Sequence, residues 1–417
     1  MSDYLKDLPP ELQKYKVNKE DFQKIKKSKT LTGGFGIVTF MKHKTTGERV
    51  VEKKTNVPLI DEFVRLTYYR EITILAAHHH HPCIVPFIGF DLSATMGYIY
   101  LKTMSKGSLK GVIVDNQKSA DDLFDYTHKL IISYGIAAGM ESLHSKNVIH
   151  RDLKPENVLL DSNYYPYITD FGTSKNLDEK MDIHQTVTAT TSYIMAPEFI
   201  DDPMAFKDTF PIDVFSYGMT LFYIWAGFQP YNNFKNMILV CQAILDNIRP
   251  SIPDYVPDPI KNLIIQCWDN APDDRPEFSS IVDQLQGPEF RLPELDEAAF
   301  TKYVTEINKC RPLSQSKSSP HLSISSVSSM SSFFSQGSVQ APEPEGESII
   351  LTNLRKDAET NVESRFQLAV ALYEGTYGPK DINEALTHFR QVQVNGTTPT
   401  MKAEAEYYLG LIFFDNN

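Results

Sequence analysis

Two short motifs near the middle of this 417-residue chain constrain it more than any other feature. The first is His-Arg-Asp-Leu-Lys-Pro-Glu-Asn at residues 150–157, and the second is Asp-Phe-Gly at residues 170–172. Together they bring three carboxylates, an amide and a lysine into one short stretch. Carboxylate and amide oxygens are hard ligands that suit Mg²⁺, and a lysine offers a compact positive charge to an anion. The two motifs at this spacing are not expected to arise together by chance.

The pair of motifs resembles the catalytic loop and the metal-binding triplet of protein kinases. The resemblance implies transfer of the γ-phosphoryl group of Mg-ATP to a hydroxyl group of a protein substrate. It makes Asp152 the residue that orients the substrate hydroxyl and accepts its proton. Lys154 would contact the transferring phosphate, and Asn157 and Asp170 would bind Mg²⁺. It also implies further parts in a fixed order along the chain.

A glycine-rich segment at residues 31–38 stands where the family has its loop over the ATP phosphates. Glycines allow backbone amides to approach phosphates closely. Leu31 occupies the place of the family's first glycine, so the segment departs from the pattern there. The nucleotide-binding residues predicted in this segment are Leu31, Gly33, Gly34, Phe35, Gly36 and Val38.

The next strand supplies the lysine that the resemblance requires. Alignment with the family's Val-Ala-Ile-Lys sequence makes Lys53 the residue that contacts the α- and β-phosphates. Lys54 is the alternative, because a one-residue shift in register would turn it inward instead. Alternation along a strand places Val51 and Lys53 on one face and Glu52 on the other. Glu52 is therefore expected to point away from the nucleotide.

Residues 69–75 follow with the apolar spacing of a helix. The resemblance makes Glu71, within this helix, the ion-pair partner of the strand lysine. Four consecutive histidines at residues 78–81 come next. Neighbouring residues of a regular element point apart, so we do not expect these side chains to converge on a metal ion. We interpret the run as a loop that ends in the family's His-Pro turn.

The resemblance also places the residues around the adenine ring. A strand at residues 98–104 would lead into the hinge between two lobes, where backbone groups read the adenine edge. Leu101 would gate the back of the nucleotide site, and Leu159 would form the floor under adenine. The predicted contacts of this part are Val51, Leu101, Thr103, Met104 and Leu159.

Residues 170–198 correspond to the activation segment of the family. Its hydroxyl-bearing residues include Ser174, Thr186, Thr188, Thr190, Thr191 and Ser192. Arg151 lies next to the catalytic aspartate and offers a cation with which a phosphate could pair. We therefore hypothesise regulation by phosphorylation at Thr186 or Thr188. An ordinary polar loop is the alternative interpretation.

Later residues refine the resemblance. Asp213 is expected to accept hydrogen bonds from the backbone of the catalytic loop, and Arg275 to pair with Glu198. A Cys-Trp pair at residues 267–268, followed by Arg-Pro, is typical of tyrosine kinases and tyrosine-kinase-like kinases. Lys-Pro-Glu at residues 154–156 is the serine/threonine form of the catalytic loop. The chain therefore resembles a tyrosine-kinase-like serine/threonine protein kinase.

The C-terminal third changes character. Serines crowd residues 314–338, a composition that cannot bury enough apolar surface to form a packed core. Residues 358–417 return to helical spacing, and Asp381 with Glu384 forms the pattern of a capping box. Matching positions recur about 40 residues apart and resemble the Sel-one-like repeat, a relative of the tetratricopeptide repeat. Because the repeat is incomplete, we expect a tail that is marginally stable, that docks elsewhere or that is cut short, and the open end after Asn417 favours truncation.

These observations define the expected architecture. The predicted fold class is α+β: a bilobal protein kinase fold with a small antiparallel β lobe plus a helix and a larger helical lobe. A disordered linker and a short all-α helical-repeat tail would follow. The predicted domains are an N-terminal extension (1–21), the kinase domain (22–287), a largely disordered serine-rich linker (288–356) and the Sel-one-like repeat (357–417).

Composition limits the partners. A formal net charge of −12 disfavours nucleic-acid binding. No apolar run is long enough to span a membrane, and the N-terminus lacks the apolar core of a signal peptide. The four cysteines are scattered without a Cys-x-x-Cys pair, so neither a zinc site nor a disulfide framework is indicated. We therefore expect a cytoplasmic protein.

Two functions remain open. The first is an active kinase with ATP and Mg²⁺ as cofactors and protein substrates. The second is a pseudokinase scaffold that binds a protein partner through its helical repeats. Lys53, Asp152, Asn157 and Asp170 are all present, which favours activity, whereas Leu31 favours the scaffold. Lys154 disfavours tyrosine phosphorylation.

Overall fold

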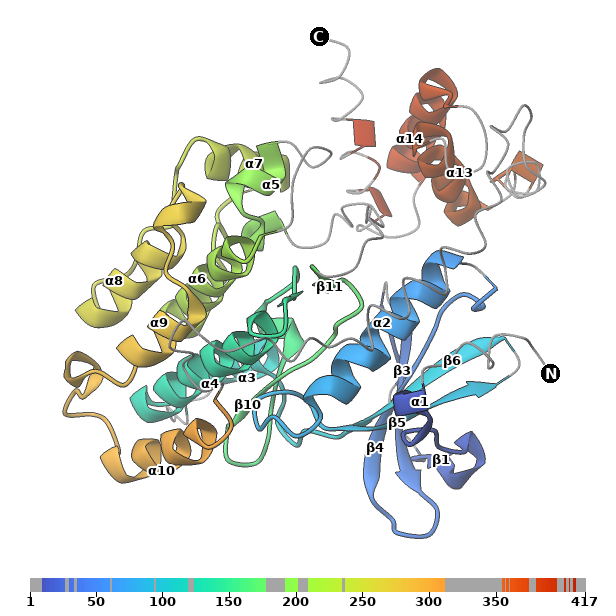
Figure 1. The fold of residues 1–417 in the computed structure, drawn as a ribbon. Coiled ribbons are helices and arrows are strands. Elements are labelled where there is room, and N and C mark those ends of the chain that lie inside the picture. The colour runs from blue at the N-terminus through green and yellow to red at the C-terminus, as the bar shows by residue number, and fades with distance from the viewer. Residues whose placement is uncertain are drawn as a thin grey trace. The chain divides into compact units, whose positions relative to one another are not determined.

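The computed structural model describes most of the chain (Figure 1). The described residues are 10–26, 30–33, 36–60, 62–93, 95–118, 124–177, 192–201, 209–234, 237–311, 361–374 and 380–395, with shorter stretches between 355 and 409. They form two compact units. Apart from Ser192, the described residues up to 232 and those from 247 to 311 belong to the first unit. The second contains the described residues from 233 to 246 and those from 355 onward.

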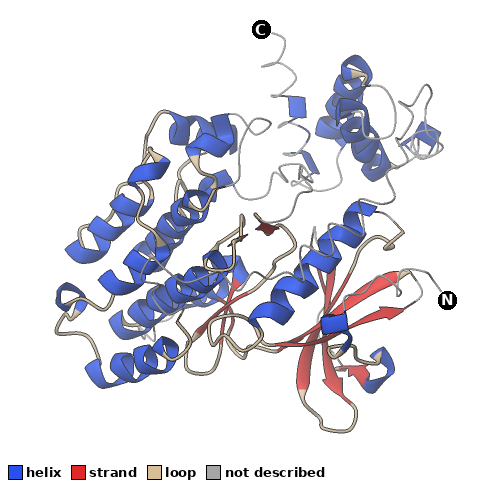
Figure 2. Ribbon diagram, in the orientation of Figure 1, coloured by secondary structure: helices blue, strands red, loops and turns tan. Residues whose placement is uncertain are grey.

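The first unit opens with an antiparallel sheet, drawn in red in Figure 2. Its strands are β1 (Phe22–Lys24), β2 (Thr30–Gly33), β3 (Gly36–His43), β4 (Arg49–Lys54), β5 (Phe87–Ser93) and β6 (Met96–Lys102). Their order is β1-β3-β4-β6-β5, with β2 paired to β3, so β5 is an edge strand. Helix α2 (Glu62–His78) packs on the sheet, and the Tyr68 hydroxyl donates a hydrogen bond to the Tyr98 carbonyl at 3.0 Å. Gly97 leaves room for the Tyr68 ring, since a Cβ there would lie 2.5 Å from it.

The rest of the first unit is largely helical. Its longer helices are α3 (Leu109–Asn116), α4 (Tyr126–His144), α6 (Pro211–Ala226), α8 (Asp258–Cys267), α9 (Phe278–Gln284) and α10 (Glu297–Asn308). The short elements are α1 (Pro10–Gln13), η2 (Lys19–Asp21), η3 (Pro155–Asn157), η4 (Ser192–Ile194), α5 (Pro197–Asp201), η5 (Pro272–Asp274) and η6 (Pro288–Phe290). Helix α6 is buried along nearly its whole length because its sequence is apolar apart from Asp213, Ser216 and Thr220, which are themselves buried. It ends at Gly227, whose φ of +81° suits glycine. The predicted combination of an antiparallel β lobe and a helical lobe is confirmed.

Two small sheets carry the loops of the helical lobe. One joins β7 (Gly107–Ser108), β9 (Val158–Leu160) and β10 (Pro166–Ile168), and the other joins β8 (Val148–Ile149) and β11 (Lys175–Asn176). The catalytic-loop motif lies between β8 and β9, and Asp-Phe-Gly follows β10. Both motifs are therefore held at the ends of strands, and strands β8 and β10 contact helix α4. Most residues of α4 are buried.

The predicted start of the linker at residue 288 is wrong. Residues 288–311 contain η6 and α10, and Asp296 caps α10 by accepting a hydrogen bond from the Ala299 amide at 3.0 Å. The buried residues of α10 recur at helical spacing: Phe300, Tyr303, Val304 and Ile307. This apolar stripe packs on α4, where the Tyr134 hydroxyl contacts Asn308 at 2.8 Å. Residues 312–354, the rest of the predicted linker, lie outside the described residues.

The second unit contains α7 (Met237–Leu245), α13 (Val362–Glu374) and α14 (Ile382–Asn395). Helices α13 and α14 share an apolar core. Its buried members are Ala358, Leu368, Ala369, Ala371, Leu372, Ala385, Phe389, Val392, Met401, Ala405, Tyr408 and Leu409. The Asp381 side chain accepts a hydrogen bond from the Glu384 amide at 2.9 Å, which is one half of the predicted capping box. The other half is absent between these two described residues, because the Asp381 amide donates to the Leu372 carbonyl at 3.0 Å. Among the described residues, every helix is too short or too polar to cross a lipid bilayer.

Candidate active site

Lys53 is the centre of a buried charge cluster. Strand β4 pairs with β3 and β6, which sets Val38 and Ile99 opposite Lys53. The Lys53 ammonium lies 2.7 and 2.9 Å from the two Glu71 oxygens, and 2.7 Å from Asp170 Oδ1. The ion pair predicted between Lys53 and Glu71 is therefore present. It joins strand β4, helix α2 and the Asp-Phe-Gly motif.

The other face of β4 carries Glu52, as alternation predicts. Glu52 is buried, and Tyr100 on the neighbouring strand donates its hydroxyl proton to Glu52 Oε2 at 2.9 Å. Tyr100 in turn stacks on Phe22, with ring centroids 4.2 Å apart. Glu52 thus serves the packing of the sheet on the face away from the charge cluster.

Electrostatics favour the charged forms of Lys53 and Asp170. Burial alone would lower the pKa of Lys53, but the charges of Asp170 and Glu71 outweigh it and raise the pKa above its ordinary value. Burial alone would raise the pKa of Asp170, but the charge and hydrogen bond of Lys53 hold it below its ordinary value. A lysinium and a carboxylate therefore stand together, the arrangement that an anionic, metal-bound ligand requires.

Gly36 brings the glycine-rich segment close to this cluster. Its φ is +151°, and a Cβ there would lie 2.6 Å from the Lys54 carbonyl oxygen and 3.4 Å from Lys53 Cγ. Both observations require glycine. In the backbone, Leu31 pairs with Val38 and Gly33 with Gly36. Gly34 and Phe35, also predicted to bind nucleotide, lie outside the described residues.

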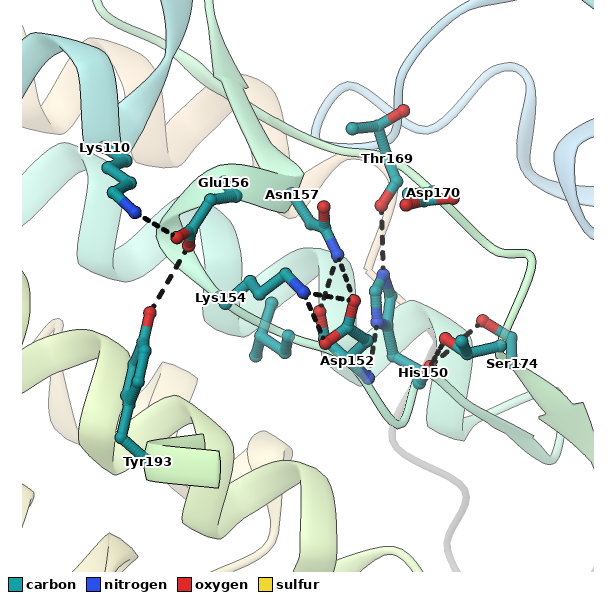
Figure 3. Close-up of polar contacts among 12 residues, drawn as sticks. Lys110, His150, Asp152, Lys154, Glu156, Asn157, Thr169, Asp170, Ser174 and Tyr193 are labelled. Atoms are coloured by element: carbon teal, nitrogen blue, oxygen red, sulfur yellow. Dashed lines mark hydrogen bonds and ion pairs between the residues drawn. The ribbon is translucent and has the colours of Figure 1, made fainter. Parts of the chain in front are cut away.

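The catalytic loop gathers its polar groups around Asp152 (Figure 3). Lys154 Nζ lies 2.8 Å from Asp152 Oδ1 and 2.7 Å from Oδ2. The amide NH₂ group of Asn157 donates to Asp152 Oδ2 at 2.8 Å and to its backbone carbonyl at 2.9 Å. Burial raises the pKa of Asp152, an effect that Lys154 partly offsets and Asp170 increases. A carboxylate with a raised pKa accepts a proton more readily.

A buried aspartate accepts hydrogen bonds from the backbone of this loop. Asp213 is fully buried on α6 and accepts hydrogen bonds from the His150 and Arg151 amides, both at 2.8 Å, as predicted. It also accepts one from His144 Nε2 at 2.9 Å. Arg151 and Asp170 both have φ of +66°, a region that L-residues rarely adopt. Such conformations persist only where the surroundings impose them.

The segment after Asp-Phe-Gly is described at its two ends. The Ser174 hydroxyl is buried and donates to the His150 carbonyl at 3.3 Å. At the far end, Arg275 forms the predicted pair with Glu198 through two parallel bonds of 2.7 and 2.8 Å. The candidate phosphorylation sites Thr186 and Thr188 fall between these ends and lie outside the described residues.

The predicted adenine contacts come from two sheets and from the segment between them. Leu101 on β6 pairs with Val51 on β4, and both Leu101 and Met104 are buried. Leu159 on β9 pairs with Ser108, so β9 lies next to the segment that leaves β6 and passes Thr103. These residues thus belong to the antiparallel sheet, to the segment that follows β6 and to the strand that follows the catalytic loop.

The comparison with known families decides the classification. A family model described as the protein kinase domain matches residues 26–285. The chain belongs to the protein kinase family. It is 33% identical over 222 residues to the serine/threonine-protein kinase TNNI3K of Rattus norvegicus, covering 52% of this chain and 26% of that protein. It is 28% identical over 277 residues to the dual specificity protein kinase shkB of Dictyostelium discoideum, covering 66% of this chain and 41% of that protein. The chain thus spans between a quarter and two fifths of these relatives.

The kinase has donors that fit a divalent metal. Asn157 uses its NH₂ group on Asp152, so its amide oxygen is left for other ligands. Asp170 contacts Lys53 through Oδ1, which leaves Oδ2 outside that pair. Two hard oxygens of this kind suit Mg²⁺, which typically takes one or two protein ligands together with phosphate oxygens.

Sequence reasoning missed three residues of the kinase site. His144 ends α4 and contacts Asp213, and no local pattern marks it. Lys110 forms an ion pair of 2.7 Å with Glu156 of the catalytic loop, and the Tyr193 hydroxyl contacts the same carboxylate at 3.3 Å. Glu156 belongs to the motif, but its partners come from α3 and η4, so only the fold brings them together.

Proposed function

We propose that this kinase transfers the γ-phosphoryl group of ATP to serine or threonine hydroxyls of protein substrates. The observation that carries the proposal is the contact of Lys53 with both Glu71 and Asp170. This contact supports an assembled phosphate-binding arrangement, because helix α2 and the Asp-Phe-Gly motif must both be in place for it to form. A scaffold without activity would not need this buried charge cluster.

Each polar residue has a distinct role in the proposed reaction. Asp152 accepts the hydrogen bond of the substrate hydroxyl and then its proton, so that the oxygen can attack in line. Lys154, already beside Asp152, neutralises charge on the transferring group. Lys53 holds the α- and β-phosphates, and Glu71 keeps Lys53 in position.

The proposed metal ligands are Asn157 and Asp170, and the proposed metal is Mg²⁺. When bound, Mg²⁺ would supply positive charge that neutralises the phosphate oxygens. The remaining nucleotide contacts are those from the sequence: Leu31, Gly33, Gly34, Phe35, Gly36, Val38, Val51, Leu101, Thr103, Met104 and Leu159.

Serine/threonine specificity is supported by the Lys-Pro-Glu sequence at residues 154–156 and by the likeness to TNNI3K, which is named a serine/threonine-protein kinase. A tyrosine-kinase-like origin is supported by the Cys-Trp pair at residues 267–268 followed by Arg-Pro at residues 275–276. The name of shkB includes dual specificity, so tyrosine phosphorylation is the outcome to test against. Regulation by phosphorylation of Thr186 or Thr188 and a cytoplasmic location complete the proposal. Free cysteines at residues 83, 241, 267 and 310 are consistent with a reducing compartment.

The second candidate function concerns the tail. Helices α13 and α14 pack into a core of their own, which supports a Sel-one-like repeat that binds a protein partner. This role could accompany the kinase activity or, in a scaffold, replace it. A partner captured equally by wild type and by a catalytically silent variant would favour the scaffold role for the tail.

The experiment that tests the main proposal is phosphoryl transfer from Mg-ATP to the chain itself and to a general protein substrate. Asp152→Asn is expected to lower the rate by about 10²–10⁴-fold, since it removes the general base. Asp115→Asn is the matched control, because its side chain is 82% exposed on α3. Phosphoamino-acid analysis then identifies the acceptor. Equal rates for wild type and Asp152→Asn would indicate a contaminating kinase and support the scaffold.

A further inference from the structure

The segment that precedes the sheet is packed against it. We call residues 12–22 the N-terminal strap. Leu12 is buried, and the strap forms a short parallel pairing with the edge strand β5. The Val17 amide donates to the Phe90 carbonyl at 2.9 Å, and the Phe90 amide donates to the Tyr15 carbonyl at 3.0 Å. The sequence predicted only an extension over this range, and the strap is instead part of the lobe.

Gly89 shows how closely the strap approaches. A Cβ at Gly89 would lie 2.4 Å from the Tyr15 carbonyl oxygen and 2.6 Å from Val17 Cγ1. The φ of Gly89 lies outside the left-handed region, so its own backbone does not call for glycine. The contact with the strap does, because no side chain fits between β5 and the strap backbone.

Tyr15 connects the strap to the end of α2. Its hydroxyl lies 2.9 Å from His79 Nδ1 and 3.5 Å from the Ala76 carbonyl oxygen. Its ring meets the His79 ring edge-on, with centroids 5.1 Å apart. Glu71 lies on the same helix, about two turns before this end. A contact that fixes the end of α2 therefore fixes the helix that presents Glu71.

The strap also contacts strand β6 of the sheet on which α2 packs. Lys19 donates to the Tyr98 hydroxyl at 2.9 Å and lies 4.0 Å from the centre of its ring. Phe22 at the end of the strap stacks on Tyr100. The backbone carbonyl of Tyr98 accepts the hydroxyl of Tyr68 from α2. The strap and α2 are therefore joined twice, directly at Tyr15 and through strand β6.

We propose that the strap holds α2 in the position where Glu71 pairs with Lys53, and that Tyr15 is a positioning residue for phosphoryl transfer. The proposal rests on the proposed kinase function. Release of the strap frees the end of α2, weakens the Glu71–Lys53 pair and loosens the grip of Lys53 on the phosphates. The strap thereby sets activity without touching substrate or nucleotide.

The test uses the full chain with Gly89→Ala, which pushes the strap away with a single methyl group. Gly111→Ala is the matched control, because a Cβ there meets Ser108 Oγ at an ordinary 3.4 Å. Tyr15→Ala removes the contact of the strap with the end of α2 directly, at a half-buried position, and Tyr15→Phe keeps the ring. Hydrogen exchange across α2 and kcat/KM for ATP are measured for each variant.

Gly89→Ala and Tyr15→Ala are expected to speed exchange in α2 and to lower kcat/KM by about tenfold, a size typical of coupling between contacting residues. Tyr15→Phe should recover most of the loss, and Gly111→Ala should match wild type. The decisive arm repeats Gly89→Ala in a Glu71→Gln background. If the strap acts through Glu71, the effect on kcat/KM disappears there.

Two results would overturn the proposal. One is unchanged exchange in α2 for both strap variants. The other is a loss of kcat/KM that is equally large in the Glu71→Gln background, as a general loss of stability would give. Hydrogen exchange does not depend on catalysis. If the wild type were inactive, the proposed kinase function would be refuted, and exchange in α2 would still test whether the strap holds this helix.

Discussion

Asp213→Asn is the substitution for which the structure sets the expected cost most clearly. Asp213 Oδ1 accepts the Arg151 amide, and Oδ2 accepts both the His150 amide and His144 Nε2. Asparagine has one oxygen, so the best arrangement keeps the two bonds at Oδ2 and turns its NH₂ group toward the Arg151 amide. One charge-assisted bond is lost and a buried N–H is left unpaired, at a cost of about 2–4 kcal/mol.

Urea unfolding followed by tryptophan fluorescence measures this cost. The two tryptophans of the chain are both buried: Trp225 lies on α6, the helix of Asp213, and Trp268 lies near Phe222 of the same helix, with ring centroids 6.0 Å apart. Asp258→Asn is the matched control, with its side chain 87% exposed, and should change the free energy of unfolding by less than about 0.5 kcal/mol. If Asp213→Asn falls within the range of the control, the argument from its hydrogen bonds is refuted.

The same variant has a pH signature. Burial alone would raise the pKa of Asp213, but the hydrogen bond and charge of His144, with those of His150, hold the pKa below its ordinary value. A pKa lowered by folding contributes stability that is fully present above the unfolded pKa and is lost as pH falls through the folded pKa. The gap in stability between wild type and Asp213→Asn should therefore narrow below about pH 4.

Three further predictions follow from other contacts. Arg275→Ala breaks the buried pair with Glu198 and should lower the free energy of unfolding by about 3 kcal/mol in the same urea assay. Phe300→Ala removes a buried ring from the contact of α10 with α4 and should lower the free energy of unfolding by about 3–5 kcal/mol. A change near zero would mean that α10 is not part of the lobe. Asp170→Asn should raise the Mg²⁺ concentration needed for half-maximal phosphoryl transfer by about tenfold, and an unchanged magnesium titration would exclude Asp170 as a ligand.

The sequence was most informative where chemistry restricts the residue type. Asp152, Asn157 and Asp170 could be named because few residues supply a base and hard oxygen ligands at fixed spacing. Lys53 could be chosen over Lys54 because the resemblance aligns it with the lysine of Val-Ala-Ile-Lys, and the ion pair with Glu71 agrees with that choice.

The sequence was least informative where contacts join distant segments. The pairing of Lys16 with Phe90 and the contact of His144 with Asp213 depend on the finished fold, and no local pattern marks them. Helix α10 is different, because Phe300, Tyr303, Val304 and Ile307 have helical spacing in the sequence. Its apolar stripe lies beyond the last kinase motif, and the predicted linker therefore begins before this helix instead of after it.

The most direct measurement of the central claim is a crystal structure of the full chain with Mg²⁺ and a non-hydrolysable ATP analogue. The account predicts that Lys53 Nζ contacts a phosphate oxygen and that Mg²⁺ is bound by Asn157 Oδ1 and the Asp170 carboxylate. It also predicts that Asp152 faces the terminal phosphate. A nucleotide bound elsewhere on the chain, or a metal ion held by other side chains, would contradict it.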